Sequence, residues 1–571
     1  MERNAIQFLL AQIYDEETSV PILPRLSAIL DKYRPRISSS RSSKLTHADS
    51  ILITYPDQIQ EVGELPLQTL TEFCGRHLKG VVSGLHILPF YPWSSDDGFS
   101  VMDYRAVAPQ YGAWNNIEQL GNHFRLMFDA VINHASTQSS WFRGFLRNDP
   151  AYRDYFIEVK GETDLSRVVR PRALPLLTTF RVGIGREKKI WTTFSADQVD
   201  LNYHNPQVLL EVIELLLFYV SRGAEFIRLD AIAYIWKESG TSCISLPQTH
   251  RIVQLLRAVL DEVAPHVKLI TETNVPHAEN ISYFGNGANE AQLVYNFSLP
   301  PLVLHAFQTG NASALTRWAS TLKLPSDKVA FFNFLASHDG IGLNPLRGIL
   351  PEVEIEAMTE RIKSRGGLVS YKVNPDGNQS PYELNVNYFD ALSDPVDSID
   401  QNIERFVTAH AILFSFAGLP GIYFHSLFGS RGWPEGVTQT GSNRSVNRQK
   451  LQFEKIELEL ADEKSLRSQV FYRLSRLLMV RAAHAAFDPY GKQRVLEFGS
   501  GVFAILREAR DEQVLCFHNV TAELQSVNLH SADMRLSPSI EWSDLVTAQS
   551  FSGKDGFALK PYQTLWLSNG K

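Results

Sequence analysis

The chain has 571 residues, of which 44% are hydrophobic and 20% charged. This is the composition of an ordinary globular protein, so a disordered or fibrous chain is excluded. The formal net charge of −7 provides no overall positive field to hold nucleic acid or an anionic membrane, and neither partner is expected. The length suggests three or four compact units, or one large barrel with insertions.

Three cysteines, Cys74, Cys243 and Cys516, lie far apart in the sequence. Their odd number and wide spacing argue against a disulfide framework and a cysteine-based zinc site, and favour a reducing cytoplasm. The first apolar stretch, residues 5–14, lacks the basic region and cleavage site of a signal peptide. No run approaches the ~20 apolar residues of a membrane-spanning helix. A soluble cytoplasmic protein is therefore expected.

Residues 1–48 predict an N-terminal helical extension, with helices on both sides of a proline-containing middle and a Ser/Arg/Lys-rich connection at its end. Eight short apolar runs rich in β-formers follow. They begin near residues 51, 83, 125, 224, 267, 291, 329 and 421. Helix-like stretches separate them, which is the pattern of parallel strands covered by helices. The sequence therefore predicts an α/β fold, a (β/α)₈ TIM barrel formed by residues 49–140, 204–340 and 401–489.

Two connections in this barrel are longer than one helix. Residues 141–203 and 341–400 are expected to form inserted lid subdomains over the strand ends, because long connections in a compact domain are usually functional. After residue 490 the pattern changes to short alternating segments. Residues 490–571 therefore predict a C-terminal antiparallel β-domain.

Polar residues stand where four of the predicted strands end, which is where TIM barrels carry their active sites. The third run ends with Asp129, Asn133 and His134. The later ones end with Arg228 and Asp230, with Glu272, and with His338 and Asp339. Arg228 and Asp230 are two residues apart, so strand alternation predicts that they share a face and that the arginine keeps the aspartate ionised.

A single carboxylate at such a position is more often a loop cap or a surface acid. Three acids at the ends of three strands are different, because they would repel one another across a pocket unless the chemistry of a site required them. Glycoside cleavage requires such a set, because one carboxylate attacks the sugar, a second protonates the leaving oxygen and a third holds sugar hydroxyls.

At these residues the chain resembles a known family. FDAVINH, FIRLDA, ITETN and ASHDG are similar, in this order, to the four signature regions of the α-amylase superfamily, glycoside hydrolase family 13. LITYPD, LPFYPWSSDDGFSVMDY, DLNYHNP and SVNRQ resemble its sucrose phosphorylase subfamily over nearly the whole chain. Within that subfamily, WKESGTSC, ETNVPH and SHDGIGLNPLRG look most like glucosylglycerate phosphorylases.

The resemblance implies roles for individual residues. Asp230 would be the nucleophile, Glu272 the general acid and base, and Asp339 the transition-state stabiliser. The glucosyl unit would be held by Asp57, Arg228, His338 and Arg448. Tyr104 stands where sucrose phosphorylases carry a histidine and is expected to stack on glucose. Asn133 and His134 stand where many amylases organise calcium or bind sugar; the subfamily implies no metal or other cofactor, and His134 is assigned to sugar binding or loop support.

The anion-binding residues are predicted in the two insertions. Tyr371 and Lys372 align roughly with the phosphate-contacting turn of sucrose phosphorylases, and Arg170 or Arg172 could approach from the first insertion. The alternative for each is a solvated loop. Asp96 and Asp97 in PWSSDDGF are interpreted as a turn rather than a cation site. Tyr91, Trp93 and Trp433 are possible sugar platforms, although most aromatics are core residues.

These observations predict a retaining α-glucosyl phosphorylase. It would convert 2-O-α-D-glucosyl-D-glycerate and inorganic phosphate reversibly into α-D-glucose 1-phosphate and D-glycerate by double displacement. Sucrose or sucrose 6-phosphate remain alternative substrates, since the glucose-binding residues would be the same. Plain hydrolysis and a non-catalytic barrel are further alternatives, and the intact acids argue against the second. The expected partners are small molecules, and the oligomeric state stays open.

Overall fold

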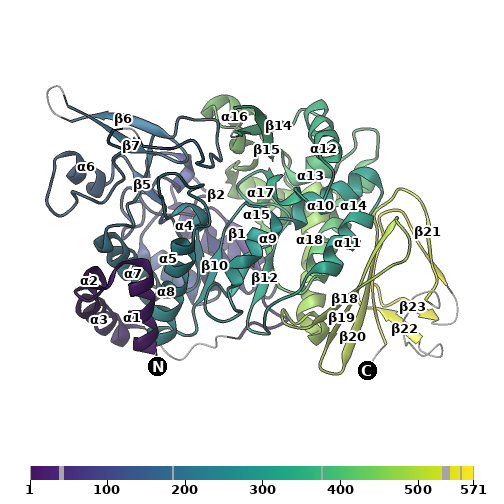
Figure 1. Cartoon of the computed structure of the whole chain (residues 1–571). Helices are drawn as coiled ribbons and strands as arrows, with labels where there is room; N and C mark the ends of the chain where they lie inside the picture. The colour runs from purple at the N-terminus through teal and green to yellow at the C-terminus, as the bar shows by residue number, and fades with distance from the viewer. Residues whose placement is uncertain are drawn as a thin grey trace.

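The computed structural model contains a closed barrel of eight parallel strands (Figure 1). It describes residues 2–37, 44–161, 163–182, 186–374, 377–529, 541–552 and 556–569. Around the barrel the strands follow one another in chain order: β1 (Ile51–Thr54), β3 (Gly84–Ile87), β4 (Arg125–Ala130), β9 (Ala224–Leu229), β10 (Lys268–Thr271), β11 (Leu293–Tyr295), β12 (Ala330–Asn333) and β16 (Leu419–Tyr423). All eight predicted strands are barrel strands, so the predicted fold class is confirmed.

Helices cover the outside of the barrel because the strands are apolar on both faces. The residues of β1, β10 and β12 are buried throughout, which leaves no face for solvent. The covering helices are α4 (Pro66–His77), α5 (Trp114–Gly121), α7 (Pro206–Ser221), α8 (Pro247–Val263), α10 (Leu299–Thr309), α11 (Ser313–Thr321), α14 (Ile399–Ser415) and α18 (Leu466–Ala483). With the strands they enclose one continuous apolar core.

Two long connections rise on the same side of the barrel, the upper side in Figure 1. Between β4 and α7 lie β5 (His134–Ser136), α6 (Ser140–Leu146), β6 (Leu177–Arg181), β7 (Glu187–Trp191) and β8 (Gln198–Asp200). Between β12 and α14 lie β13 (Ile341–Gly342), α12 (Glu352–Ser364), β14 (Leu368–Val373), β15 (Gln379–Asn385) and α13 (Tyr388–Leu392). A β-bridge between Arg170 and Val373 joins the two insertions, so they meet above the strand ends.

The N-terminal residues pack on the outer helices. Helices α1 (Glu2–Ile13) and α3 (Ile22–Tyr33) flank Pro21, and they contact α8 and α7 respectively. Arg34 pairs with Glu262 at 2.8 Å. The Ser/Arg/Lys-rich connection predicted after these helices includes residues 38–43, which lie outside the described residues.

The C-terminal residues form a six-stranded antiparallel sheet, shown in yellow in Figure 1. Its order is β18 (Lys492–Leu496), β19 (Val502–Ala509), β20 (Glu512–Asn519), β25 (Thr564–Ser568), β22 (Glu541–Asp544) and β23 (Ser550–Ser552). One face has an apolar core of its own. On the other side, Tyr562 accepts a hydrogen bond from the buried Arg405 of α14 at 2.8 Å, which ties the sheet to the barrel.

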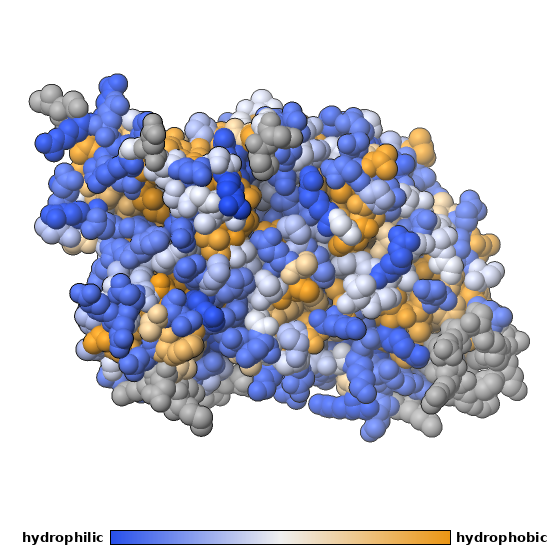
Figure 2. Space-filling model, in the orientation of Figure 1, coloured by the Kyte–Doolittle hydropathy of each residue, from blue (hydrophilic) through white to orange (hydrophobic). Residues whose placement is uncertain are grey.

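The molecular face in Figure 2 carries hydrophilic residues interspersed with smaller hydrophobic patches. Within the described ranges, each helix is too short or too polar to cross a bilayer.

Candidate active site

The three predicted catalytic acids line one pocket at the carboxyl ends of the barrel strands. Asp230 directly follows β9, Glu272 directly follows β10, and Asp339 lies in the loop after β12. Strands β9 and β10 are neighbours with Arg228 opposite Ile270, so the first two acids emerge side by side. The barrel topology therefore brings together carboxylates that are 109 residues apart in the chain.

The guanidinium group of Arg228 connects these acids. Its Nη1 lies 2.8 Å from Asp230 Oδ1, and its Nη2 lies 3.8 Å from Glu272 Oε2. The same Nη1 lies 2.5 Å from Asp129 Oδ1 below, and only 2% of the Arg228 side chain is exposed. The predicted shared face of Arg228 and Asp230 is observed.

The electrostatics of this pair differ from the expectation that Arg228 simply keeps Asp230 ionised. Burial raises the pKa of Asp230, and the neighbouring charge of Glu272 raises it further, whereas Arg228 lowers it. Burial also raises the pKa of Glu272. Two adjacent carboxyl groups with raised pKa values titrate as a coupled pair, so the pair holds a proton to higher pH than isolated carboxyl groups would. Although the pKa of Asp230 is raised to about 8, Arg228 lies closer to Asp230 than to Glu272, and on this geometry we assign the negative charge to Asp230 and the proton to Glu272.

Asp129, below the pair, stays ionised. It accepts from His86 Nε2 at 2.7 Å and from Arg228. Burial alone would raise the pKa of Asp129, but His86 and Arg228 lower it to about 2. This buried anion offsets the charge of Arg228 and so leaves the pair above it with raised pKa values.

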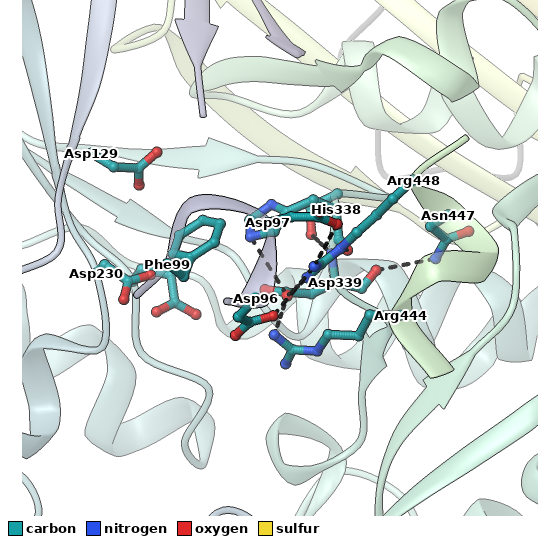
Figure 3. A network of polar contacts seen from close by, with 12 residues as sticks. Asp96, Asp97, Phe99, Asp129, Asp230, His338, Asp339, Arg444, Asn447 and Arg448 are labelled. Carbon is teal, nitrogen blue, oxygen red and sulfur yellow. Dashed lines mark hydrogen bonds and ion pairs between the residues drawn. The ribbon is translucent and has the colours of Figure 1, made fainter. Parts of the chain in front are cut away.

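Asp339 is held by two arginines that follow β16 in the chain. Arg444 Nη1 lies 2.5 Å from Asp339 Oδ1, and Arg448 Nη2 lies 3.7 Å from the same oxygen. Figure 3 shows both guanidinium groups pointing toward Asp339, with Arg448 also contacting Asp96 and Asp97. Arg444 also contacts Glu383 at 2.7 Å, so it links Asp339 to the second insertion.

Asp96 and Asp97 were interpreted from the sequence as a turn only. They do form a tight turn, η2 (Asp96–Gly98), in which both have left-handed backbone (φ 54° and 49°). Gly98 also has positive φ, and a Cβ there would lie 2.6 Å from Pro89 O. The turn presents its acids to the site, because Arg448 Nη1 lies 3.1 Å from Asp97 and 3.3 Å from Asp96.

Three other predicted binding residues also line the pocket: His134, His338 and Arg172. His338 stacks on Phe99 with ring centroids 4.7 Å apart. His134 Nε2 lies 2.9 Å from Phe99 O. Arg172 Nη2 lies 3.6 Å from Asp96. Burial lowers the pKa of both histidines, so they are neutral near pH 7.

Further lining residues were not singled out from the sequence. They include Gln198, Asn274, Tyr382, Glu383 and Arg444. Arg444 lies on the short turn η6 (Asn443–Asn447), and Arg448 immediately follows this turn, four residues later; this spacing was a usable signal. Tyr382 and Glu383 lie on β15. They reach the pocket because the second insertion folds back over the barrel, which the sequence pattern did not reveal.

The other predicted binding residues lie behind or beside the lining. Asp57 pairs with Lys450 at 2.8 Å. Tyr104 is buried, donates to His134 O at 2.7 Å and stacks on Trp141, so one face of its ring has an aromatic neighbour. Arg228 and Arg448 do not line the pocket but contact acids that do, Arg228 at Asp230 and Arg448 at Asp96 and Asp339.

The other three loop residues predicted to bind anions, Tyr371, Lys372 and Arg170, lie outside the lining. Lys372 donates to Asn344 Oδ1 at 2.8 Å, and burial lowers the pKa of this lysine to about 8. Arg170 donates to Leu174 O at 2.6 Å. Tyr371 stands next to Lys372 on β14 and is half-buried. Tyr91, considered as a sugar platform, is buried and stacks on Tyr219.

A buried lysine fastens the first insertion to the barrel beside the pocket. Lys237 Nζ lies 2.5 Å from Asp200 Oδ2 and 2.7 Å from Asn133 Oδ1. Asp200 ends β8, and Asn133 precedes His134. Across the described part of the chain, no group of three or more His, Cys, Asp or Glu side chains is arranged to hold a metal ion.

Comparisons with known proteins agree with this geometry. A family model of the α-amylase catalytic domain matches residues 78–341. The chain is 50% identical to a glucosylglycerate phosphorylase from Spirochaeta thermophila, covering 98% of this chain and 97% of the relative. It is 47% identical to one from Escherichia coli, covering 99% and 100%. The crystal structure of a sucrose 6F-phosphate phosphorylase from Thermoanaerobacter thermosaccharolyticum superposes with TM-score 0.72 and 25% identity, covering 83% of this chain and 94% of that one.

Removing the ammonium of Lys237 tests the link between insertion and barrel. Lys237→Met keeps the apolar stem but leaves Asp200 buried without its cation, so we expect a loss of about 3 kcal/mol in unfolding free energy. Urea unfolding measures it. Lys189→Met, at an exposed position of β7, should change stability by less than ~0.5 kcal/mol. Equal stability of the two variants would show that the ion pair contributes nothing.

Proposed function

Because the chain belongs to the α-amylase family, glycoside hydrolase family 13, we propose that it is a retaining α-glucosyl phosphorylase acting on 2-O-α-D-glucosyl-D-glycerate. The observation that carries the chemistry is the pair Asp230 and Glu272, which emerge side by side and share the Arg228 guanidinium. The choice of glycerate is supported by the relatives that are about half identical over nearly the whole chain.

The first half-reaction breaks the bond between carbon 1 of glucose and the glycerate oxygen. Asp230 attacks carbon 1 and forms an ester bond with it, while Glu272 gives its proton to the departing oxygen. The charge and proton assignment in the site matches these two roles. Asp339, held by Arg444 and Arg448, is placed to accept from sugar hydroxyls and to stabilise positive charge on the ring.

The second half-reaction returns the enzyme to its starting state. A phosphate oxygen attacks carbon 1, the ester to Asp230 breaks, and any proton on the attacking oxygen passes to Glu272. Each step inverts carbon 1, so the product is α-D-glucose 1-phosphate with net retention. Water at the same position would give hydrolysis, and the reverse reaction uses the same groups.

Both compounds that meet the glucosyl intermediate, phosphate and glycerate, are anions. Arg172 is the cation of the first insertion that lines the pocket, and Arg444 also lines it. Arg444 is already engaged by Asp339 and Glu383, whereas the contact of Arg172 with Asp96 is long, at 3.6 Å. Arg172 is therefore the group more readily available to an incoming phosphate or carboxylate.

We also infer a reducing compartment. Cys74, Cys243 and Cys516 are all free and buried, which fits a cytoplasmic location.

The acceptor is tested by supplying α-D-glucose 1-phosphate with D-glycerate, fructose, fructose 6-phosphate or glycerol and measuring phosphate release. The proposal predicts that D-glycerate gives the highest kcat/KM. Faster release with fructose or fructose 6-phosphate would assign the enzyme to the sucrose or sucrose 6-phosphate reaction, and equal release without any acceptor would indicate hydrolysis.

The proton on Glu272 is tested by pH dependence. Phosphorolysis should fall as pH rises, because Glu272 loses the proton it must donate, and should fall at low pH, because Asp230 becomes protonated. Glu272→Gln should lower phosphorolysis of the glucoside by about a thousandfold. Release of fluoride from α-glucosyl fluoride needs no acid, so in this variant it should be much less impaired and should lack the alkaline fall. Equal losses with both donors would contradict the acid role.

Replacing Arg172 and Lys372 in turn tests which of these side chains binds the phosphate and glycerate anions. A charged hydrogen bond contributes about 1.5–3 kcal/mol, so Arg172→Ala should raise KM for phosphate and for glycerate by about tenfold or more while leaving hydrolysis of α-glucosyl fluoride largely intact. Lys372→Ala, at the residue first predicted for this role, is the matched control and should raise both KM values less, since its ammonium is bound to Asn344. The reverse order would restore Lys372 as the ligand.

A further inference from the structure

A second polar pocket lies at the opposite end of the barrel from the catalytic acids. It has a volume of about 550 Å³ and is lined by Lys268, Gln292 and Val329. Lys268 begins β10, and the other two immediately precede β11 and β12. Since Glu272 follows the carboxyl end of β10, this pocket stands at the amino-terminal ends of the same strands and is separate from the active site.

A lysine is unusual at this buried position at the start of a barrel strand. The residue is 9% exposed, and within the described ranges its ammonium group has no hydrogen bond and no ion pair. Lysine is rarely buried without a partner, because loss of hydration is costly for its charge. The pocket is therefore the place from which a counter-charge can reach this ammonium group.

The charged groups around Lys268 make a counter-charge for its ammonium group still more favourable. Burial and the charges of Arg257 and Arg125 lower the pKa of Lys268 to about 8, and Asp261 only partly opposes them. The nearby carboxylates are already committed. Asp261 pairs with Arg257 at 2.9 Å, and Arg125 is held by Asp49 at 3.1 Å and by Glu225 at 2.9 Å.

The other polar groups of the pocket are mainly donors. Gln292 Oε1 accepts from Arg257 Nη1 and from Leu269 N, each at 3.0 Å, so its amide nitrogen remains as a donor. Lys44, Lys328 and the Tyr490 hydroxyl also line the pocket. Two acids are present, Asp261, which is paired, and Asp327, which is exposed beside Lys328 in the chain. This lining suits an anion.

We propose that this pocket binds a phosphate group, as inorganic phosphate or as a phosphomonoester, with Lys268 as its innermost ligand. A dianion matches a buried ammonium with two arginines close by better than a monoanionic carboxylate does. The site does not depend on the proposed reaction, although the substrate and product of that reaction have the right chemistry to occupy it.

Titration calorimetry with inorganic phosphate tests the site. Lys268→Met keeps the stem packed and removes the charge. The wild-type protein should bind one phosphate per chain more than this variant, or bind it at least tenfold more tightly. KM for phosphate in the proposed phosphorolysis should be unchanged, which separates this site from the active site. Lys323→Met, at an exposed lysine near the pocket but outside its lining, should behave as wild type.

Unfolding temperatures show whether the variant is folded and whether the charge is responsible. Without phosphate, Lys268→Met should be at least as stable as wild type, because an unpaired buried cation is removed. With phosphate, the wild type should gain more stability than the variant, since a ligand stabilises the state that binds it. Equal gains and equal binding in both proteins would overturn the proposal.

Competition experiments distinguish inorganic phosphate from a phosphomonoester as the ligand of this pocket. Inorganic phosphate bound at the Lys268-dependent site should be displaced by α-D-glucose 1-phosphate if phosphomonoesters fit, and should resist it if the site takes the free ion. D-Glycerate should displace it poorly in either case. Displacement by chloride at a similar concentration would show that the pocket has no preference for phosphate and would overturn the assignment.

Discussion

The buried charge of Arg228 is the constraint on which the active site depends. Its guanidinium lies within 2.5 Å of Asp129, 2.8 Å of Asp230 and 3.8 Å of Glu272. Without this cation, three carboxylates from adjacent strands would repel one another in a water-poor environment. Arginine suits the position because it remains protonated even when buried. Its nearer approach to Asp230 makes two otherwise similar carboxyl groups unequal, and the proposed mechanism uses that inequality to separate a nucleophile from an acid.

The two insertions contribute further lining residues to this pocket at the carboxyl ends of the barrel strands. The first contributes Arg172, and the second contributes Tyr382 and Glu383. The bridge between Arg170 and Val373 joins them, and the contact of Arg444 with Glu383 connects the second insertion to Asp339. Barrel strands thus position the acids to which the proposed reaction assigns the chemistry on glucose, whereas the insertions line the rest of the pocket.

The barrel could be predicted from the sequence because each strand is a continuous apolar run bounded by polar or turn residues, as in ILITY and VAFFNF. Asp230 and Glu272 were predictable for the same reason, since a residue that ends a barrel strand has a fixed place. Asp96 was not, because its contact with the site depends on how a left-handed turn and a short helical turn meet in space; the sequence signal for Arg444 was only its spacing from Arg448. Lys372 was proposed from loop similarity, and loop folding directs its ammonium to Asn344 instead. Its role remains a prediction.

The covalent role of Asp230 is the central claim and can be measured directly. Glu272→Gln enzyme is incubated with α-glucosyl fluoride in the absence of phosphate, quenched in acid, digested and analysed by mass spectrometry. In this variant the glucosyl group can be loaded without an acid but is removed slowly without a base. The account predicts one added glucosyl residue on the peptide that contains Asp230, and its loss when phosphate is added before quenching. A glucosyl residue attached to Asp339 or to another side chain would contradict it.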